Sequence, residues 1–245
     1  MKIAVYGAGA MGRLVAQGLV EDNRFEFTGM ISKTGSGENV YETLDSIPQD
    51  IEGIIDFSHP TNLDELLNFA ELKQIPVLIA TTGFTGEEIE TIETRAAQIP
   101  IIFTYNTSLG VNLLGELVKK MAGALGSDFD IEIIEKHHNK KLDSPSGTAK
   151  FLLDKVAEGH SEDLSPVYGR NGMARREKNE VGVHAIRGGS IVGEHSVIFA
   201  GEDEVIEIKH EALSKKIFVR GALTGINFLK DKKNGLYTMK DVLGL

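Results

Sequence analysis

The residues best suited to proton transfer gather in one segment, 135–149, which reads EKHHNKKLDSPSGTA. It contains two adjacent histidines, His137 and His138, followed by Lys141. Neighbouring side chains of an extended chain point in different directions, so one histidine can act on a reacting centre while the other binds a substrate group. The segment therefore predicts acid–base chemistry on a small molecule.

The end of the same segment predicts an anion-binding site. Ser146, Gly147 and Thr148 open a predicted helix, and Pro145 helps to fix its entry. The first N–H groups of a helix have no intrahelical partner and carry partial positive charge, which suits a carboxylate. With the Lys141 ammonium nearby, we expect the ligand to be a small dianion.

Metal binding is the competing interpretation of His137 and His138. Neither has another histidine four residues later, and the sequence lacks both cysteine and an H-E-x-x-H pattern, so no metal is expected. Of the other histidines, His184, His195 and His210 fall on predicted strands and His160 in a predicted loop. We expect these to be structural or surface residues.

A second motif, GAGAMG at residues 7–12, directly follows a predicted strand and opens a predicted helix. In that context a G-x-G-x-x-G pattern binds the pyrophosphate of a dinucleotide. Gly7 permits the tight turn, Gly9 lets backbone N–H groups approach the phosphates, and Gly12 lets the helix pack closely on the strand. The expected cofactor contacts are Gly7, Ala8, Gly9, Ala10, Met11 and Gly12. A purely structural glycine turn is the alternative.

The end of the second predicted strand bears on cofactor selectivity. An NAD-selective site usually carries Asp or Glu there, but residues 30–34 read MISKT. Lys33, flanked by two hydroxyl residues, suits a ribose 2′-phosphate, so we expect NADPH to be preferred, with NADH as an alternative cofactor. An ordinary solvated lysine is the other interpretation.

Small polar residues follow two later strands at their carboxyl ends, the edge at which such sheets bind ligands. We expect them to contact the nicotinamide half of the cofactor, although each taken singly could be only a turn. They are Ala80, Thr81, Thr82, Thr104, Tyr105, Asn106 and Thr107.

A predicted α/β fold positions these motifs. Apolar runs at 2–6, 25–31, 53–57, 76–80 and 100–104 alternate with helical periodicity around 11–22, 61–73 and 86–98, which is typical of a Rossmann-type parallel sheet. An apolar helix at about 109–125 then leads to a strand at 130–133. Further strands, at 183–187, 195–200 and 205–211, follow a predicted loop at about 160–180 and indicate a smaller α+β domain with a mixed sheet.

The order of elements predicts a discontinuous first domain, because helical periodicity returns at 214–229 and 238–243. Residues 1–108 with 219–245 are expected to form a dinucleotide-binding Rossmann domain. Residues 109–218 are expected to form the substrate-binding and oligomerisation domain.

Composition restricts the partners. The 26 Lys and Arg against 36 Asp and Glu give a formal charge of -10, which disfavours nucleic acid and anionic membranes, so anionic ligands must be captured locally. The absence of cysteine fits a reducing compartment, and the first residues are too short an apolar run for a signal peptide. We expect a cytoplasmic protein.

On these motifs the chain resembles, end to end, the family of 4-hydroxy-tetrahydrodipicolinate (dihydrodipicolinate) reductases. The resemblance implies NAD(P)H-dependent reduction of 4-hydroxy-tetrahydrodipicolinate in the diaminopimelate route to lysine. It implies that His137 donates or accepts a proton and that Lys141 donates one. The implied ligands of the substrate carboxylates are His138, Gly147 and Thr148. The residues that carry the resemblance lie at 7–12, 56–58, 80–84, 106–112, 135–149, 189–195 and 239–243.

The resemblance further implies a homotetramer assembled through the sheet of the second domain. Two departures are visible: the glycine loop is one residue shorter than in many members, and no acidic residue adjoins Lys33. Two other functions are compatible with the residues. One is a non-catalytic NADP-sensing module, and the other is a reductase of a different imine or keto acid.

Overall fold

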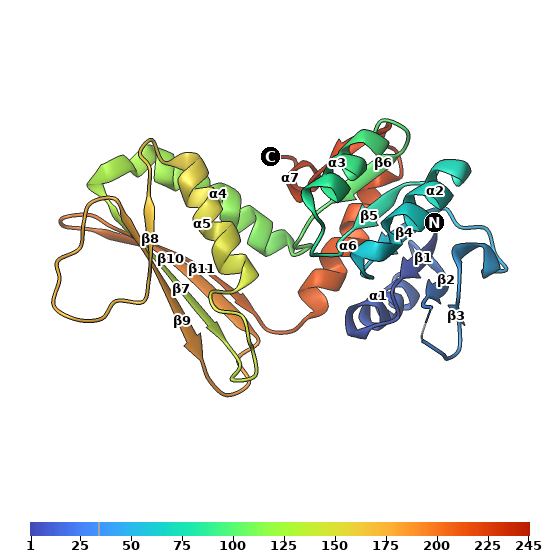
Figure 1. Ribbon diagram of the computed structural model, residues 1–245, viewed down its shortest axis with the longest axis horizontal. Helices are drawn as coiled ribbons and strands as arrows, with labels where there is room; N and C mark the ends of the chain where they lie inside the picture. Colours follow the sequence, from blue (N-terminus) through green and yellow to red (C-terminus); the bar gives the residue numbers. More distant parts are fainter. Residues whose placement is uncertain (34) are drawn as a thin grey trace. The chain divides into compact units, whose positions relative to one another are not determined.

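The computed structural model describes residues 1–33 and 35–245, which divide into two compact units (Figure 1). Unit 1 comprises Met1–Leu109 and Lys216–Leu245, and unit 2 comprises Gly110–Lys215. The predicted domain boundaries lie one residue before the first of these divisions and three residues after the second. The second difference arises because helix α6 begins at Lys216 and its first turn belongs to unit 1.

Unit 1 is built on a seven-stranded sheet in the order β12-β6-β5-β4-β1-β2-β3, with all neighbouring pairs parallel. The order reverses next to β1, the place at which open parallel sheets bind ligands beyond the carboxyl ends of their strands. The strands are β1 (Lys2–Tyr6), β2 (Glu26–Ile31), β3 (Val40–Tyr41), β4 (Gly53–Asp56), β5 (Val77–Ile79), β6 (Pro100–Phe103) and β12 (Gly235–Tyr237).

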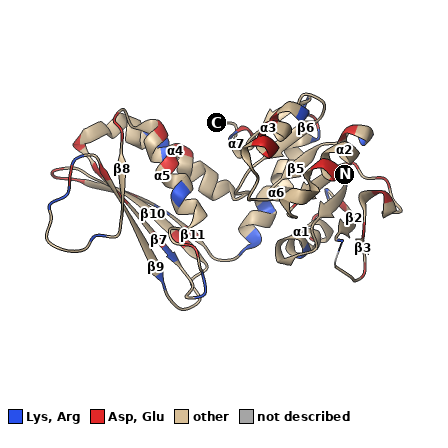
Figure 2. Ribbon diagram, in the orientation of Figure 1, with Lys and Arg blue, Asp and Glu red and all other residues tan. Residues whose placement is uncertain are grey.

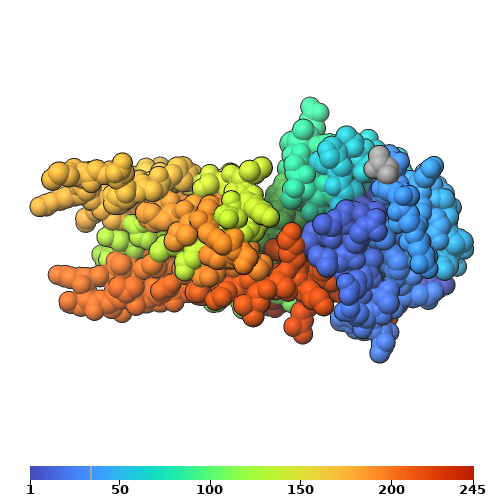
Figure 3. Space-filling model, turned by 90° about the horizontal axis from the view of Figure 1, so that it is seen from below, coloured from blue at the N-terminus to red at the C-terminus, as the bar shows by residue number. Residues whose placement is uncertain are grey.

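Helices cover both faces of this sheet, because successive residues of each buried strand point to opposite faces. Ala4 and Tyr6 of β1 join one core cluster with residues of α2 and α3, whereas Ile3 and Val5 join another with residues of α1 and α6. In Figure 3 residues of α1 (blue) lie beside residues of α6 (orange-red). The helices are α1 (Ala10–Glu21), α2 (Leu63–Lys73), α3 (Gly86–Arg95), α6 (Lys216–Leu229) and α7 (Met239–Leu243), with short 3-10 turns at Leu44–Ser46 and Pro60–Asn62.

Unit 2 contains a five-stranded sheet in the order β11-β10-β7-β9-β8. Its pairs from β11 to β7 are antiparallel and those from β7 to β8 are parallel, so the sheet is mixed. Helices α4 and α5 lie side by side over one face and bury its apolar residues (Figure 1). The elements are α4 (Leu109–Leu125), a 3-10 turn (Gly126–Asp128), β7 (Asp130–His137), α5 (Gly147–Gly159), β8 (Ser165–Tyr168), β9 (Glu180–Arg187), β10 (Gly193–Ala200) and β11 (Val205–Ala212).

The predicted fold class, a Rossmann-type parallel sheet with a smaller mixed-sheet α+β domain, is confirmed. Two local predictions are wrong. The predicted loop at 160–180 contains β8, an edge strand that includes Pro166 and is mostly exposed, so it lacks an apolar pattern. Strand β7 continues to His137, whereas the prediction ended it at residue 133. The prediction was too short because the charged residues 135 and 136 interrupt the apolar alternation.

Positive and negative charges are interspersed in both units (Figure 2). Within the described ranges, no helix is both long enough and apolar enough to cross a membrane.

Candidate functional site

The turn between β1 and α1 has the geometry of a phosphate-binding loop. Gly7 adopts φ +107°, which favours glycine, and its N–H donates to the carbonyl oxygen of Ile31 (2.9 Å). A Cβ at Gly12 would collide with the carbonyl oxygen of Gly7, whereas no atom lies within 4 Å of the equivalent position at Gly9. Gly9 precedes α1 without a side-chain cap. An uncapped helix N-terminus therefore lies beside open space.

The other residues of this loop, Ala8, Ala10 and Met11, lie in the same turn or the first turn of α1, where Ala8 and Met11 pack against the core. The polar segments after β5 and β6 emerge at the same edge of the sheet. Cross-strand pairing places Asp56 beside Ile79 and Ile79 beside Phe103, so segments 80–82 and 104–107 begin on adjacent strands.

Within these segments, the side chains differ in exposure. Tyr105 is 57% exposed, but Thr107 is 1% exposed and its hydroxyl donates to the carbonyl oxygen of Phe218 on α6 (2.7 Å). Thr107 therefore contributes its side chain to packing within unit 1. Thr81 Oγ1 accepts a hydrogen bond from the N–H of Ser58 (2.8 Å), which joins the loops after β4 and β5. The remaining residues, Ala80, Thr82, Thr104 and Asn106, continue the same edge.

Asp56 ends β4 at this edge and is almost fully buried. Burial raises the pKa of Asp56 to about 6, although hydrogen bonds involving Ser58 and Thr81 oppose that rise.

Lys33 follows β2, where the sequence predicts the ribose-binding position. Its ammonium forms an ion pair with Glu65 of α2 (2.9 Å). The sequence did not indicate this acidic partner, because Glu65 belongs to a helix that is distant in the chain. Thr34, one of the two hydroxyl residues beside Lys33, lies outside the described residues.

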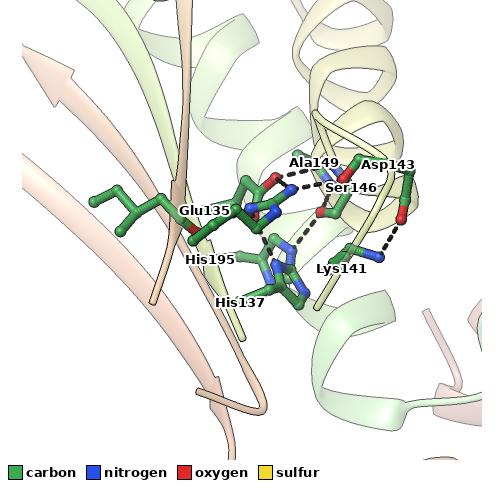
Figure 4. Close-up of polar contacts among 9 residues, drawn as sticks. Glu135, His137, Lys141, Asp143, Ser146, Ala149 and His195 are labelled. Atoms are coloured by element: carbon green, nitrogen blue, oxygen red, sulfur yellow. Dashed lines mark hydrogen bonds and ion pairs between the residues drawn. The ribbon is translucent and has the colours of Figure 1, made fainter. Parts of the chain in front are cut away.

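In unit 2, the central feature is the buried carboxylate of Glu135 on β7, shown in Figure 4. Odd-numbered residues of β7 face helices α4 and α5, and this alternation places Glu135 and His137 on the buried face after Ile131 and Ile133. Glu135 is 0% exposed. A carboxylate in such a position must have hydrogen-bond donors around it to remain ionised.

Four donors meet this carboxylate. Arg187 of β9 donates through both terminal nitrogens (2.7 and 2.7 Å), the N–H of Ser146 donates to Oε1 (3.0 Å), and Nδ1 of His137 lies 2.6 Å from Oε2. Burial alone would raise the pKa of Glu135, but the bonds from Arg187, His137 and Ser146 outweigh it and hold the pKa below its ordinary value. Glu135 is therefore an anion that fixes its neighbours.

His195 of β10 completes the cluster. Its ring meets that of His137 edge to face (centroids 5.1 Å apart), and its Nε2 lies 3.0 Å from Ser146 Oγ. Burial and the nearby His137 lower the pKa of His195 to about 4, so His195 is neutral at physiological pH. The sequence predicts a structural or surface residue at His195. The structure places it in the interior, 4% exposed, in contact with two residues of the site.

The loop after β7 places Lys141 beside Asp143, with Nζ 2.8 Å from Oδ1 (Figure 4). The Lys141 ammonium lowers the pKa of Asp143. Arg187 also donates to the carbonyl oxygen of Asp143 (2.7 Å), so one guanidinium links this loop to Glu135. Nδ1 of His138 is buried and has no hydrogen-bond partner within the described residues.

The three residues predicted to form an anion site at the start of α5 differ in their exposure. Ser146 is 2% exposed, and its N–H and Oγ contact Glu135, Ala149 and His195, so its polar groups hold the turn together. Gly147 is exposed, and no atom lies within 4 Å of a Cβ built there. Thr148, in the first turn, is half-buried.

Sequence patterns identified the loop and the helix start but missed Glu135, Arg187 and His195 as members of the site. The period-two pattern of β7 and β10 is the signal that would have placed Glu135 and His195 on the buried face. Across the described ranges, no group of three or more His, Asp or Glu residues has the geometry to hold a metal ion.

Sequence comparison covers both units. The family profile described as "Dihydrodipicolinate reductase, N-terminus" matches residues 1–107, and "Dihydrodipicolinate reductase, C-terminus" matches residues 110–243. A protein named 4-hydroxy-tetrahydrodipicolinate reductase from Clostridium tetani is 43% identical over 238 residues, 96% of this chain and 93% of the relative. One of the same name from Exiguobacterium sibiricum is 45% identical over 243 residues, 98% of this chain and 95% of the relative.

Solved structures share the fold. The dipicolinate-bound dihydrodipicolinate reductase from Paenisporosarcina sp. TG-14 gives a TM-score of 0.78 at 21% identity, over 97% of each chain. A probable dehydrogenase from Thermotoga maritima gives 0.63 at 11% identity, over 99% of this chain and 92% of the other. The family profiles and the full-length relatives lead to one conclusion: this chain belongs to the dihydrodipicolinate reductase family.

Proposed function

We propose that the protein uses NAD(P)H to reduce 4-hydroxy-tetrahydrodipicolinate to tetrahydrodipicolinate, in the diaminopimelate route of lysine biosynthesis. One observation carries the proposal. A histidine tied to a buried carboxylate, a lysine and an open helix start lie together in unit 2 of a chain whose relatives are named as this reductase.

The glycine loop is the proposed holder of the cofactor pyrophosphate, because Gly9 leaves space at an uncapped helix N-terminus. When bound, NAD(P)H supplies a hydride from C4 of its nicotinamide. Lys33 supports a preference for NADPH, since its ammonium can attract a 2′-phosphate. Glu65 moderates that preference, because it already pairs with Lys33 (2.9 Å).

The substrate carboxylates are assigned to His138, Gly147 and Thr148. The buried Nδ1 of His138 has no partner within the described part of the chain, and Gly147 leaves its surroundings open. A carboxylate at the start of α5 would meet backbone N–H groups and the positive end of the helix. We assign Ser146 a supporting role, since its polar groups already contact Glu135, Ala149 and His195.

His137 and Lys141 are the proposed proton donors. Hydride addition to a ring carbon conjugated with C=N moves an electron pair into the ring, where a proton must follow. His137 keeps Nδ1 on Glu135 and has Nε2 for proton transfer, while the Lys141 ammonium can donate a proton or stabilise the developing charge. Loss of water from the 4-hydroxyl group before reduction completes the overall balance.

The proposed assembly is a cytoplasmic homotetramer formed through the sheet of unit 2. Large apolar side chains exposed on this sheet, Ile186 (46%) and Val205 (64%), support an interface there. Light scattering of the purified protein tests the assembly, and a monomeric mass would exclude it.

The activity is tested by following nicotinamide absorbance while a synthase makes the substrate in situ from pyruvate and aspartate semialdehyde. NADPH and NADH are compared for the wild type, for Lys141→Ala and for Lys140→Ala, an exposed neighbouring lysine that serves as the matched control. We expect rapid oxidation by the wild type and by Lys140→Ala, and oxidation slowed by about 10²–10³ in Lys141→Ala. Folded protein that binds nucleotide but oxidises neither cofactor would exclude the reductase and favour a sensor of NADP.

A further inference from the structure

The proposed reaction gives Glu135 no direct role. It is fully buried, and both of its oxygens are shared between donors. Oε1 receives Arg187 Nη2 and the N–H of Ser146, while Oε2 receives Arg187 Nη1 and faces Nδ1 of His137. A guanidinium and a backbone amide can only donate, so three of these four bonds have a fixed direction.

The fourth bond is fixed by the other three. Because Glu135 is an anion held by Arg187 and the amide of Ser146, it can act towards His137 only as an acceptor. The Nδ1 atom of His137, 2.6 Å from Oε2, must therefore carry a hydrogen. The proton that His137 gains or loses is then restricted to Nε2.

Two neighbours of the His137 ring, Gly193 and His195, leave Nε2 accessible. A Cβ built at Gly193 would lie 3.1 Å from Nε2, so glycine at this position preserves the space around it. His195, whose ring packs edge to face on His137, is neutral and directs its own Nε2 to Ser146. The neighbouring imidazole therefore supports the ring of His137 without adding positive charge beside it.

We propose that Glu135, clamped by Arg187, is the positioning residue that selects the Nδ1–H tautomer of His137 and so reserves Nε2 for proton transfer to the substrate. The catalytic consequence rests on the proposed function, because it takes His137 as the proton donor. The tautomer itself depends only on the buried hydrogen bonds and can be measured without turnover.

The same strand provides a matched control. Glu132 of β7 also joins an arginine and a histidine, with Arg176 Nε at 3.2 Å from Oε1 and His184 Nε2 at 2.9 Å from Oε2. Residues 132 and 135 point to opposite faces of the sheet, so the Glu132 cluster lies away from Glu135 and His137. A carboxylate that only stabilises unit 2 would leave the tautomer of His137 unchanged when it is replaced.

The closing experiment compares Glu135→Gln with Glu132→Gln. The carboxamide nitrogen of glutamine can only donate, and Arg187 already donates towards both oxygen positions. At the Oε1 position the amide nitrogen would face two donors, Arg187 Nη2 and the N–H of Ser146, whereas at the Oε2 position it would face only Arg187 Nη1. The Oε2 position is therefore favoured. There the nitrogen donates to Nδ1 of His137, which favours the Nε2–H tautomer. Long-range proton–nitrogen NMR of the ¹⁵N-histidine-labelled protein at alkaline pH reports the tautomer of each assigned ring.

We expect Nδ1–H at His137 in the wild type, a shift to Nε2–H in Glu135→Gln, and no change at His137 in Glu132→Gln. We also expect kcat to fall about 100-fold only in Glu135→Gln, with the nucleotide Kd unchanged, because an amide that orients a histidine in the wrong tautomer removes its proton-transfer role. Glu135→Asp, which keeps the charge, is expected to retain the Nδ1–H tautomer.

Two results would overturn the proposal: Nε2–H at His137 in the wild type, or equal kcat values for the two glutamine variants. If Glu135→Gln does not fold, the tautomers of the wild type and Glu135→Asp decide it. A wild type that reduces no substrate would refute the proposed function, while the tautomer would still decide the positioning role.

Discussion

His195 is expected to make unit 2 less stable in mild acid, and His195→Gln removes this effect. Burial and the nearby His137 lower the pKa of His195 from 6.5 to about 4. Between these values the unfolded chain binds a proton that the folded chain refuses, so stability present above pH 6.5 is lost as the pH falls through this window. Glutamine can keep a hydrogen bond to Ser146 Oγ but does not titrate.

The two pKa values set the size of the effect. Moving from pH 7 to pH 4.5 costs the wild type about 2 kcal/mol of unfolding free energy through this one group, from the linkage relation with pKa 6.5 unfolded and about 4 folded. Asp56 has the opposite slope, because burial raises its folded-state pKa from 3.8 to about 6 and stability falls as pH rises through that range. The wild type and His195→Gln both contain Asp56, so its effect cancels in the difference between their unfolding free energies.

The assay is equilibrium unfolding in urea, followed by circular dichroism, for both proteins from pH 7 to pH 4.5. At pH 7 we expect His195→Gln to be less stable by about 1 kcal/mol, through lost packing and hydrogen bonding. At pH 4.5 we expect the variant to equal or exceed the wild type. A difference that stays constant across the range would refute the reasoning, as would NMR titration showing His195 protonated near pH 6.5.

Three further predictions concern the cofactor and the proton donor. Gly9→Ala is expected to leave the melting temperature unchanged but to weaken nucleotide binding at least about tenfold, since its Cβ meets only the space that a phosphate would occupy. Gly12→Ala is expected to lose about 2–3 kcal/mol of stability by overpacking against Gly7. Calorimetry measures both the melting temperature and the nucleotide affinity and so distinguishes the two variants. Lys141→Ala is expected to lower kcat by about 10²–10³ with nucleotide affinity intact, and a change confined to KM would contradict its role in proton transfer. Lys33→Ala is expected to raise the KM for NADPH but not for NADH. Glu65→Gln is expected to lower the KM for NADPH by removing the carboxylate that competes for Lys33. Equal effects on both cofactors would show that Lys33 does not bind the 2′-phosphate.

Much of the fold followed from sequence because strands and helices of the first unit have clear apolar periods. Strands β1, β4, β5 and β6 occur within a residue or two of the predicted runs. The elements that sequence missed lie at sheet edges. β3, β8 and β12 are short, and their residues remain partly exposed, so burial imposes no strong pattern on them.

The candidate site was predicted only where its residues are consecutive. The His137 to Thr148 segment and the glycine loop were both identified, because neighbouring residues of the required types are visible in the sequence itself. The ion pair of Lys33 with Glu65 was not, since it joins a strand end to a separate helix. Nor was the burial of Ser146, whose polar groups contact the protein rather than an open surface.

By itself the sequence determined the α/β class, the glycine-rich turn after β1, the segment that carries His137 and Lys141, and membership of a family. These properties depend on local periodicity and on short runs of residues, which are visible in the sequence without knowledge of the fold. Only the tertiary structure decided which way His137 is held. Its partner Glu135 is charged by virtue of Arg187, 52 residues away on β9, and His195 approaches from β10. Strand pairing creates these contacts, and burial gives them their strength, because a desolvated carboxylate must be satisfied by whichever donors the fold brings to it.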